Sequence, residues 1–229
     1  MLKKIALALM VLSLGQVMAQ DKSPIIRDGQ FWTSISTKTD ISKRWQLSSE
    51  LAFRANNNWQ SANSLFMEFG AKWSKKDWSA SANFRTVESY NRKENRWFTD
   101  ISYDIKSSKR LDISTRVRVQ HAFYSDDRVA QTYIRNKFKA SYNIKKSPLN
   151  PVADVELYCN AGAYQPVFEV IRWSLGLEFE LIKKLDLTIM YRNEREFNIV
   201  APKQSNILIV AFSHDFGKLY KKNKKGKKD

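Results

Sequence analysis

The sequence of 229 residues has few of the side chains that build disulfides, metal centres or common catalytic sites. Cys159 is the only cysteine, so an internal disulfide or a cysteine-based metal cluster is excluded. His121 and His214 are the only histidines, and no HExxH, GxSxG or CxxC motif occurs. We therefore expect a protein that is not an enzyme and that carries no cofactor and no metal.

The chain also lacks a hydrophobic run long enough for a transmembrane helix, which needs roughly 20 consecutive apolar residues. The longest apolar run, residues 5–14, lies at the N-terminus between Lys3-Lys4 and Val17-Met18-Ala19. A basic start, a short apolar stretch and small residues are typical of a secretory signal peptide. We predict that residues 1–19 form this peptide, that it is cleaved after Ala19, and that the rest is exported.

Glycine and proline are scarce, at 7 and 5 residues, and no Ser/Gly-rich linker divides the chain. We therefore predict one domain, residues 20–217, followed by a solvated basic periplasmic tail, residues 218–229. The net charge is +16, and the tail with its lysine run supplies a large part of it. In an exported protein the remaining basic charge favours anionic lipid headgroups as neighbours, so we expect no nucleic-acid partner.

Apolar and polar residues alternate with a period of two along most of the body, which predicts β-strands. In one segment Trp173, Leu175, Leu177 and Phe179 share a face, with Glu178 on the other. Similar segments, about ten residues long as in membrane-spanning strands, lie near residues 31–39, 45–54, 65–73, 78–85, 99–105, 111–120, 134–144, 154–159, 185–194 and 206–216. The chain is therefore expected to be all-β.

A period of two does not tell which face points outward, but the strand number does. A barrel of ten or more strands encloses a lumen that apolar side chains cannot fill. The polar face should therefore line the lumen and the apolar face should meet lipid, as in outer-membrane barrels. Connections that alternate between short, such as residues 74–77, and long, such as residues 87–96, favour the same fold, with periplasmic turns and external loops.

The predicted fold is a transmembrane, antiparallel, up-and-down β-barrel of about twelve strands. Twelve strands require a first strand at Lys22–Arg27 that turns at Asp28-Gly29, a favoured hairpin dipeptide. Pro24 weakens this strand, so eleven segments or a barrel of ten strands remain alternatives. The other alternative is a soluble exported β-sandwich that acts as a binding module.

Three segments carry a family resemblance: Phe31-Trp32-Thr33, Ile41-Ser42-Lys43-Arg44-Trp45-Gln46-Leu47 and Phe212-Ser213-His214-Asp215-Phe216. With these segments the mature chain resembles a domain-of-unknown-function family of Gram-negative outer-membrane β-barrels. The resemblance implies this fold and the outer membrane as location, and it implies no activity. Such barrels typically end on a terminal aromatic residue, whereas Phe216 is followed here by the lysine tail.

The lumen face contains charges of both signs. A hairpin centred on Asp126-Asp127 would place Arg118 opposite Arg135 and Arg116 opposite Lys137, and like charges that face each other are unfavourable. Ideal hairpins across the short turns would offer Asp100 to Arg116 and Glu156 to Lys139. Arg118, Arg135 and Lys137 would then be the least compensated cations, with Arg116, Asp100, Lys139 and Glu156 as supporting pairs.

Two interpretations of this lumen follow, and the first is favoured. The charges could form a salt-bridged interior, or the three cations could form a constriction that favours anions. We expect a structural barrel or a small-solute channel of the outer membrane. Its expected partners are membrane lipid, lipopolysaccharide and, during insertion, the barrel-assembly machinery. The sequence does not indicate an oligomeric state.

The enzymatic alternative is an outer-leaflet lipid-modifying enzyme at the barrel rim. It would use His121, which continues the outward register of its strand, with a nearby serine such as Ser125 as nucleophile. A general base must lie within hydrogen-bonding reach of its nucleophile. The distance between these two side chains therefore tests the idea.

Overall fold

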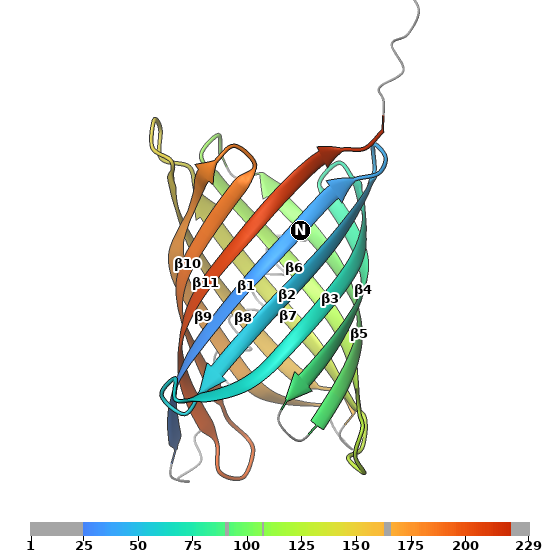
Figure 1. The fold of residues 1–229 in the computed structure, drawn as a ribbon, viewed down its shortest axis with the longest axis vertical. Coiled ribbons are helices and arrows are strands. Elements are labelled where there is room, and N and C mark those ends of the chain that lie inside the picture. The colour runs from blue at the N-terminus through green and yellow to red at the C-terminus, as the bar shows by residue number, and fades with distance from the viewer. Residues whose placement is uncertain (1–24, 90–91, 107, 163–165, 221–229) are drawn as a thin grey trace, which may run out of the picture.

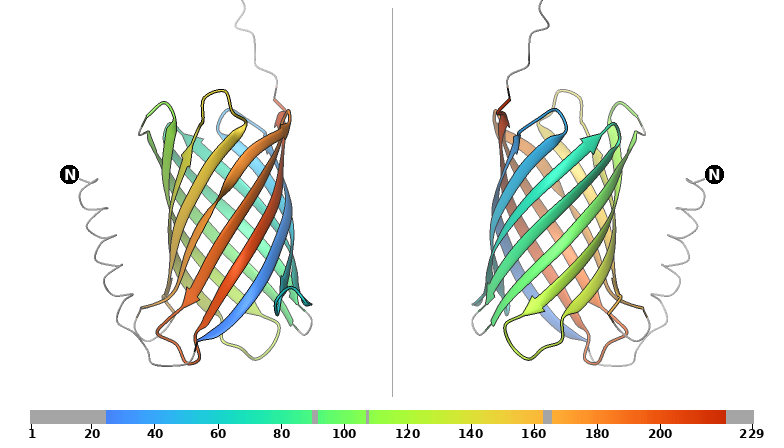
Figure 2. Two further views of the ribbon diagram at one scale, coloured as in Figure 1. Left: turned by 90° about the vertical axis from the view of Figure 1, so that its left-hand side faces the viewer. Right: turned by 90° about the vertical axis from the view of Figure 1, so that its right-hand side faces the viewer.

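The computed structural model describes residues 25–89, 92–106, 108–162 and 166–220. The strands in this part of the chain close into a single barrel (Figures 1 and 2). They are β1 (Ile26–Asp40), β2 (Trp45–Asn56), β3 (Ser61–Lys75), β4 (Trp78–Ser89), β5 (Arg92–Lys106), β6 (Leu111–Tyr124), β7 (Gln131–Tyr142), β8 (Leu149–Asn160), β9 (Val167–Ile182), β10 (Leu185–Glu196) and β11 (Lys203–Lys218). The predicted signal peptide and residues 221–229 of the predicted tail lie outside the described residues.

Consecutive strands pair antiparallel, and the barrel closes by parallel pairing of β1 with β11. This seam is continuous from Ile26 opposite Lys203 to Asp40 opposite Lys218. An up-and-down barrel with an odd number of strands brings its first and last strands together in the same direction. The all-β barrel is thus confirmed with eleven strands, and the expectation that every pair is antiparallel fails at the seam.

The predicted hairpin at Asp28-Gly29 is wrong, because β1 runs through both residues without turning. The groups that would stabilise a turn are bound to Asn58, in the connection between β2 and β3. The Gly29 N–H donates to Asn58 Oδ1 at 3.1 Å, and the Asn58 N–H donates to Asp28 Oδ1 at 3.2 Å. Residues 22–24 of the proposed extra strand lie outside the described residues.

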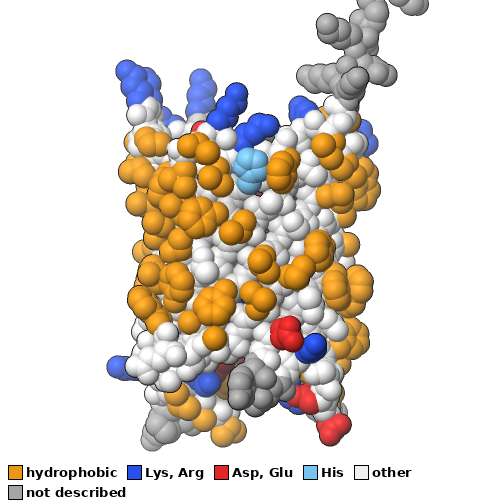
Figure 3. Space-filling view, in the orientation of Figure 1, with side chains coloured by type: hydrophobic (Ala, Val, Ile, Leu, Met, Phe, Trp, Pro, Cys, Tyr) orange, Lys and Arg blue, Asp and Glu red, His pale blue; other side chains and the backbone are white. Residues whose placement is uncertain are grey.

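The direction of the side chains agrees with the sequence prediction. Leu175 and Leu177 of β9 are 57% and 41% exposed on the outer surface, whereas Ser174, which precedes Leu175, is 1% exposed. Apolar side chains cover much of the outer surface in Figure 3, and charged side chains gather at its two ends. A single closed sheet with this polarity excludes the two-sheet sandwich.

The contrast between short turns and long loops is weaker than predicted. Residues 87–96 were expected to form a long loop, but β4 continues to Ser89 and β5 begins at Arg92. The polar residues of this segment form a regular ladder, in which Glu88 lies opposite Lys93 and makes an ion pair at 3.4 Å. Cross-strand charge pairing therefore extends the strands beyond their apolar part.

None of the described segments is a helix of the length and apolarity needed to cross a membrane.

Candidate functional site: an arginine and aromatic belt in the lumen

One inward-facing residue from each of the strands β1 to β10 contributes to a belt around the lumen. In chain order, which is also the order around the barrel, the belt consists of Trp32, Arg54, Phe66, Arg85, Phe98, Arg118, Arg135, Tyr158, Arg172 and Arg192. The alternating strand pattern places each of them on the polar face of its strand. We refer to these ten residues as the belt.

Guanidinium groups lie over the aromatic rings of the belt. Arg118 is 3.8 Å from the centroid of Phe98, and Arg54 is 4.1 Å from that of Trp32. Arg172 and Arg192 complete the belt across the seam, at 5.7 and 5.6 Å from Trp32. Such contacts stabilise a cation against the face of a ring. The aromatic residues therefore hold the arginines in defined positions inside the barrel.

The sequence prediction of which like charges face each other is confirmed. Arg118 lies opposite Arg135 and Arg116 lies opposite Lys137 in the register of β6 and β7. The register of these strands is symmetric about Asp126-Asp127, as the sequence prediction assumed, so the facing pairs follow from that symmetry. All four residues, together with Glu156, line one lumen cavity.

The prediction that Arg118, Arg135 and Lys137 lack compensation is wrong. Arg118 donates to both carboxylate oxygens of Asp100, at 2.6 and 2.8 Å. Arg135 donates to Glu156 at 2.9 Å, and Lys137 lies 3.0 Å from Asp154. Each of the three cations thus has a carboxylate partner, and none of them is an unpaired anion site.

The predicted supporting pairs are shifted because the turns are not ideal hairpins. Asp100 lies opposite Arg118, and Arg116 reaches it only diagonally, at 3.9 Å. Lys139 lies opposite Asp154 instead of Glu156, and its Nζ is 2.6 Å from Glu178 Oε1 on β9. Long side chains reach across to second neighbours, so the strand register alone does not determine ion pairs.

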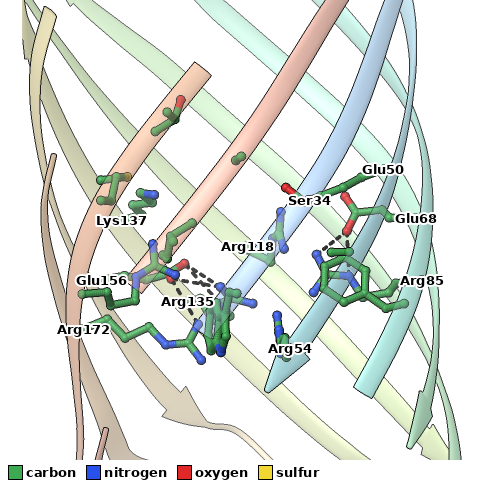
Figure 4. Close-up of a pocket in the computed structure, with 18 of the residues that line it drawn as sticks. Ser34, Glu50, Arg54, Glu68, Arg85, Arg118, Arg135, Lys137, Glu156 and Arg172 are labelled. Carbon is green, nitrogen blue, oxygen red and sulfur yellow. Dashed lines mark hydrogen bonds and ion pairs between the residues drawn. The ribbon is translucent and has the colours of Figure 1, made fainter. Parts of the chain in front are cut away.

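Glu156 is the centre of the largest ion cluster in the described part of the chain, and it is only 2% exposed. Its carboxylate accepts from Arg116 at 2.6 Å and from Arg135 at 2.9 Å. Arg172 lies 3.8 Å away and also donates to the hydroxyl of Tyr158. One carboxylate thereby holds three guanidinium groups from three different strands. Figure 4 shows Glu156 with two of them, Arg135 and Arg172.

The cavity beside the belt has a volume of about 460 Å³. Nine cationic and three anionic side chains line it: Arg54, Arg85, Arg96, Arg116, Arg118, Arg135, Lys137, Arg172 and Arg192, with Glu50, Glu68 and Glu156. A second lumen cavity of about 530 Å³, which includes Glu178, Glu180 and Asp186, lies toward the ends of the strands that meet at residues 183–184. Thr188 borders both cavities. The lumen thus contains a cationic compartment and a more acidic one.

The rim does not assemble a catalytic pair from His121 and Ser125. His121 Nδ1 forms a hydrogen bond with Thr132 Oγ1 at 2.7 Å, and its ring packs edge-on against Phe123. The Ser125 hydroxyl accepts from the Lys93 N–H at 3.0 Å. Among the described residues, no group of three or more His, Cys, Asp or Glu side chains is placed to hold a metal ion.

The sequence prediction missed the aromatic members of the belt and Arg54. Phe66 and Phe98 lie on the inner face although their neighbours Leu65 and Trp97 are exposed on the outer face. In an alternating strand, an apolar residue at a position where the pattern expects a polar one indicates such an inward-facing aromatic side chain. Trp32 could have been found in the same way, between Phe31 and Thr33.

The fold is similar to solved outer-membrane barrels. A structure described as a bacterial polysaccharide outer membrane secretin has a TM-score of 0.53 and 12% identity, covering 74% of this chain and 63% of that chain. The NanC porin has a TM-score of 0.51 and 15% identity, covering 72% of this chain and 85% of that chain. The chain therefore spans less than two thirds of the length of the first of these proteins. At such identities the likeness establishes the barrel fold.

No curated protein sequence matches the chain. A family profile, described as "Protein of unknown function (DUF2490)", matches residues 29–206, which include strands β2 to β10 and most of β1. This confirms the resemblance to a barrel family of unknown function that the sequence carries. The chain belongs to the DUF2490 family.

Proposed function

We propose that this protein is an outer-membrane channel without enzymatic activity, and that its lumen favours small anions. The observation that carries the proposal is the lining of the belt cavity, in which nine cationic side chains face three carboxylates. Rings of Arg and Lys select anions in pores. Asp100 and Asp154, which pair with Arg118 and Lys137, are not among the side chains that line this cavity.

The location follows from the outer surface and from the predicted export signal. Large apolar side chains such as Leu51, Ile101 and Leu175 are 47 to 57% exposed. A continuous apolar surface of this kind is unfavourable in water and is typical of a surface that meets lipid. Together with the predicted signal peptide, this favours the Gram-negative outer membrane, with lipopolysaccharide as a lipid neighbour and the barrel-assembly machinery as the insertion partner.

A structural barrel that does not conduct is the second candidate, and the extent of ion pairing in the lumen favours it. Ten of the twelve charged side chains that line the belt cavity make an ion pair or a charged hydrogen bond to a described residue. A network in which most charges are paired restricts the motion of its side chains. Ion conductance therefore separates the two candidates.

The test is to reconstitute the folded chain in planar bilayers and to measure the reversal potential in a potassium chloride gradient. We expect conductance with a reversal potential whose sign is that of the chloride equilibrium potential. Arg54→Gln, which removes a lining cation without breaking an ion pair, should shift the reversal potential toward the potassium equilibrium potential. Arg44→Gln, in an exposed turn outside the lumen, is the matched control and should leave it unchanged. Absence of conductance would favour the structural barrel, and cation preference would contradict the proposal.

A further inference from the structure

Two of the charged side chains that line the belt cavity make no ion pair, although an opposite charge acts on each at longer range, Arg85 on Glu50 and Glu194 on Arg54. Within the described residues, Glu50 and Arg54 are the lining side chains that make neither an ion pair nor a charged hydrogen bond. Glu50 lies opposite Glu68, and the latter is bound to Arg85. The cavity therefore offers one free carboxylate and one free guanidinium.

The two free groups are far apart along one strand. Glu50 and Arg54 lie four residues apart on the inner face of β2, and a rise of roughly 3.3 Å per residue separates their Cα atoms by about 13 Å. In Figure 4, Glu50 lies beside Ser34 toward one end of the pocket and Arg54 toward the other. They are too distant to neutralise each other.

The Arg54 guanidinium is held in place by aromatic rings instead of a carboxylate. It lies 4.1 Å from the centroid of Trp32 and 4.9 Å from that of Phe66. These rings occupy its faces and leave the N–H donors at its edge for other partners. None of these donors is among the buried polar atoms without a hydrogen-bond partner, so they point into the cavity or to solvent.

We propose that this cavity binds a dipolar solute of short-peptide length, with its ammonium group at Glu50 and its carboxylate at Arg54. A charge in a partly dehydrated site is unfavourable unless it is paired, and one solute with both charges satisfies both groups. A free α-amino acid is too short to span them. A peptide of three or four residues, at roughly 3.3 Å per residue, has the required reach. The volume of about 460 Å³ lies in the range of small-ligand sites.

This inference goes beyond the proposed function and depends on it only in that the solute must reach the lumen. The probe is triglycine, compared with N-acetyl-triglycine, which lacks the ammonium group, and triglycine amide, which lacks the carboxylate. Binding to the full chain folded in detergent is measured by titration calorimetry. We expect triglycine to bind and each blocked peptide to bind about tenfold or more weakly, because each loses a charged hydrogen bond.

Two variants assign the ends of the peptide. Glu50→Gln should remove the preference for a free ammonium group and keep the preference for a free carboxylate, and Arg54→Gln should do the reverse. Glu88→Gln and Arg44→Gln, at exposed positions outside the cavity, are the matched controls and should keep both preferences. Heat-modifiable gel migration verifies that each variant is folded, and the comparison of peptides on the unmodified chain does not depend on any variant.

Equal binding of the three peptides, or no binding of triglycine, would overturn this inference. The outcome is separable from that of the proposed function, because conductance is measured without peptide. A barrel that conducts anions and ignores triglycine would retain the proposed function and lose the dipolar site. A barrel that binds triglycine and does not conduct would retain the site and lose the channel.

Discussion

Arg118 and Arg135 lie directly opposite each other on β6 and β7, and each guanidinium turns to a different carboxylate. Arg118 binds Asp100 on β5, and Arg135 binds Glu156 on β8. The repulsion expected between the facing arginines is therefore relieved by the strands on either side. Ion pairing in this lumen joins neighbouring hairpins and not only the two strands of one hairpin.

Replacing Glu156 by Gln should strongly destabilise the barrel. The substitution leaves the Arg116, Arg135 and Arg172 guanidinium groups without their shared carboxylate in a buried position. Removing one partner of a buried pair costs about 3–5 kcal/mol. Urea unfolding of the refolded protein measures this, with Glu88→Gln, at an exposed pair, as the control. A decrease in the free energy of unfolding no larger than that of the control would contradict this expectation and would mean that water or ions neutralise the cluster.

Replacing Leu175 by Arg should destabilise the barrel in a bilayer. The side chain is 57% exposed in the middle of β9, and a cationic residue on the lipid face near the bilayer centre costs about 2–4 kcal/mol. Val200→Arg, at a 96% exposed position outside the strands, is the control. Unfolding in phosphatidylcholine vesicles compares the two variants. Equal stability would contradict the assignment of this face to lipid.

Replacing Gly176 by Ala should disturb the contact between β9 and β10. An added Cβ would lie 2.3 Å from the backbone oxygen of Ile189 and 2.8 Å from the Met190 Cα, so backbone atoms would have to move. Overpacking of this kind costs about 1–3 kcal/mol. In Gly162→Ala the nearest atom would be 3.4 Å away, and this control should change the unfolding midpoint much less.

The Asp126 carboxylate should titrate below the ordinary range of an aspartate. In this exposed loop the Arg128 side chain donates to both carboxylate oxygens, at 2.7 to 3.0 Å, and lowers the pKa of Asp126. The lowered pKa means that the interaction is present above the ordinary aspartate pKa and is lost as the pH falls through the lower value. Arg128→Gln should raise the pKa back toward the ordinary range, as measured by NMR titration of the carboxyl carbon. An unchanged titration would contradict this pairing.

The sequence predicted which residues share a face because a strand with a period of two offers only two faces, and the expected number of strands then decided which face points outward. Placing Leu175 outward places Glu178, and every other residue of the strand at an odd offset from Leu175, inward. It also predicted the facing pair of Arg118 and Arg135, because folding the two strands symmetrically about Asp126-Asp127 gives the observed register. The two faces and the facing pair are local consequences of strand geometry, whereas the outward direction of the apolar face followed from the expected barrel of ten or more strands.

The free charges, the ion pairs and the belt could not be predicted in this way. Glu156 binds cations from three other strands, and Trp32 contacts Arg172 and Arg192 across the β1–β11 seam. Such contacts depend on barrel closure and on the reach of long side chains across the lumen. The order of the residues determines strand alternation, because neighbouring residues of a strand point to opposite faces. Barrel closure, the parallel seam between β1 and β11 and the partner of each lumen charge depend on contacts between distant segments, so the tertiary structure decides them.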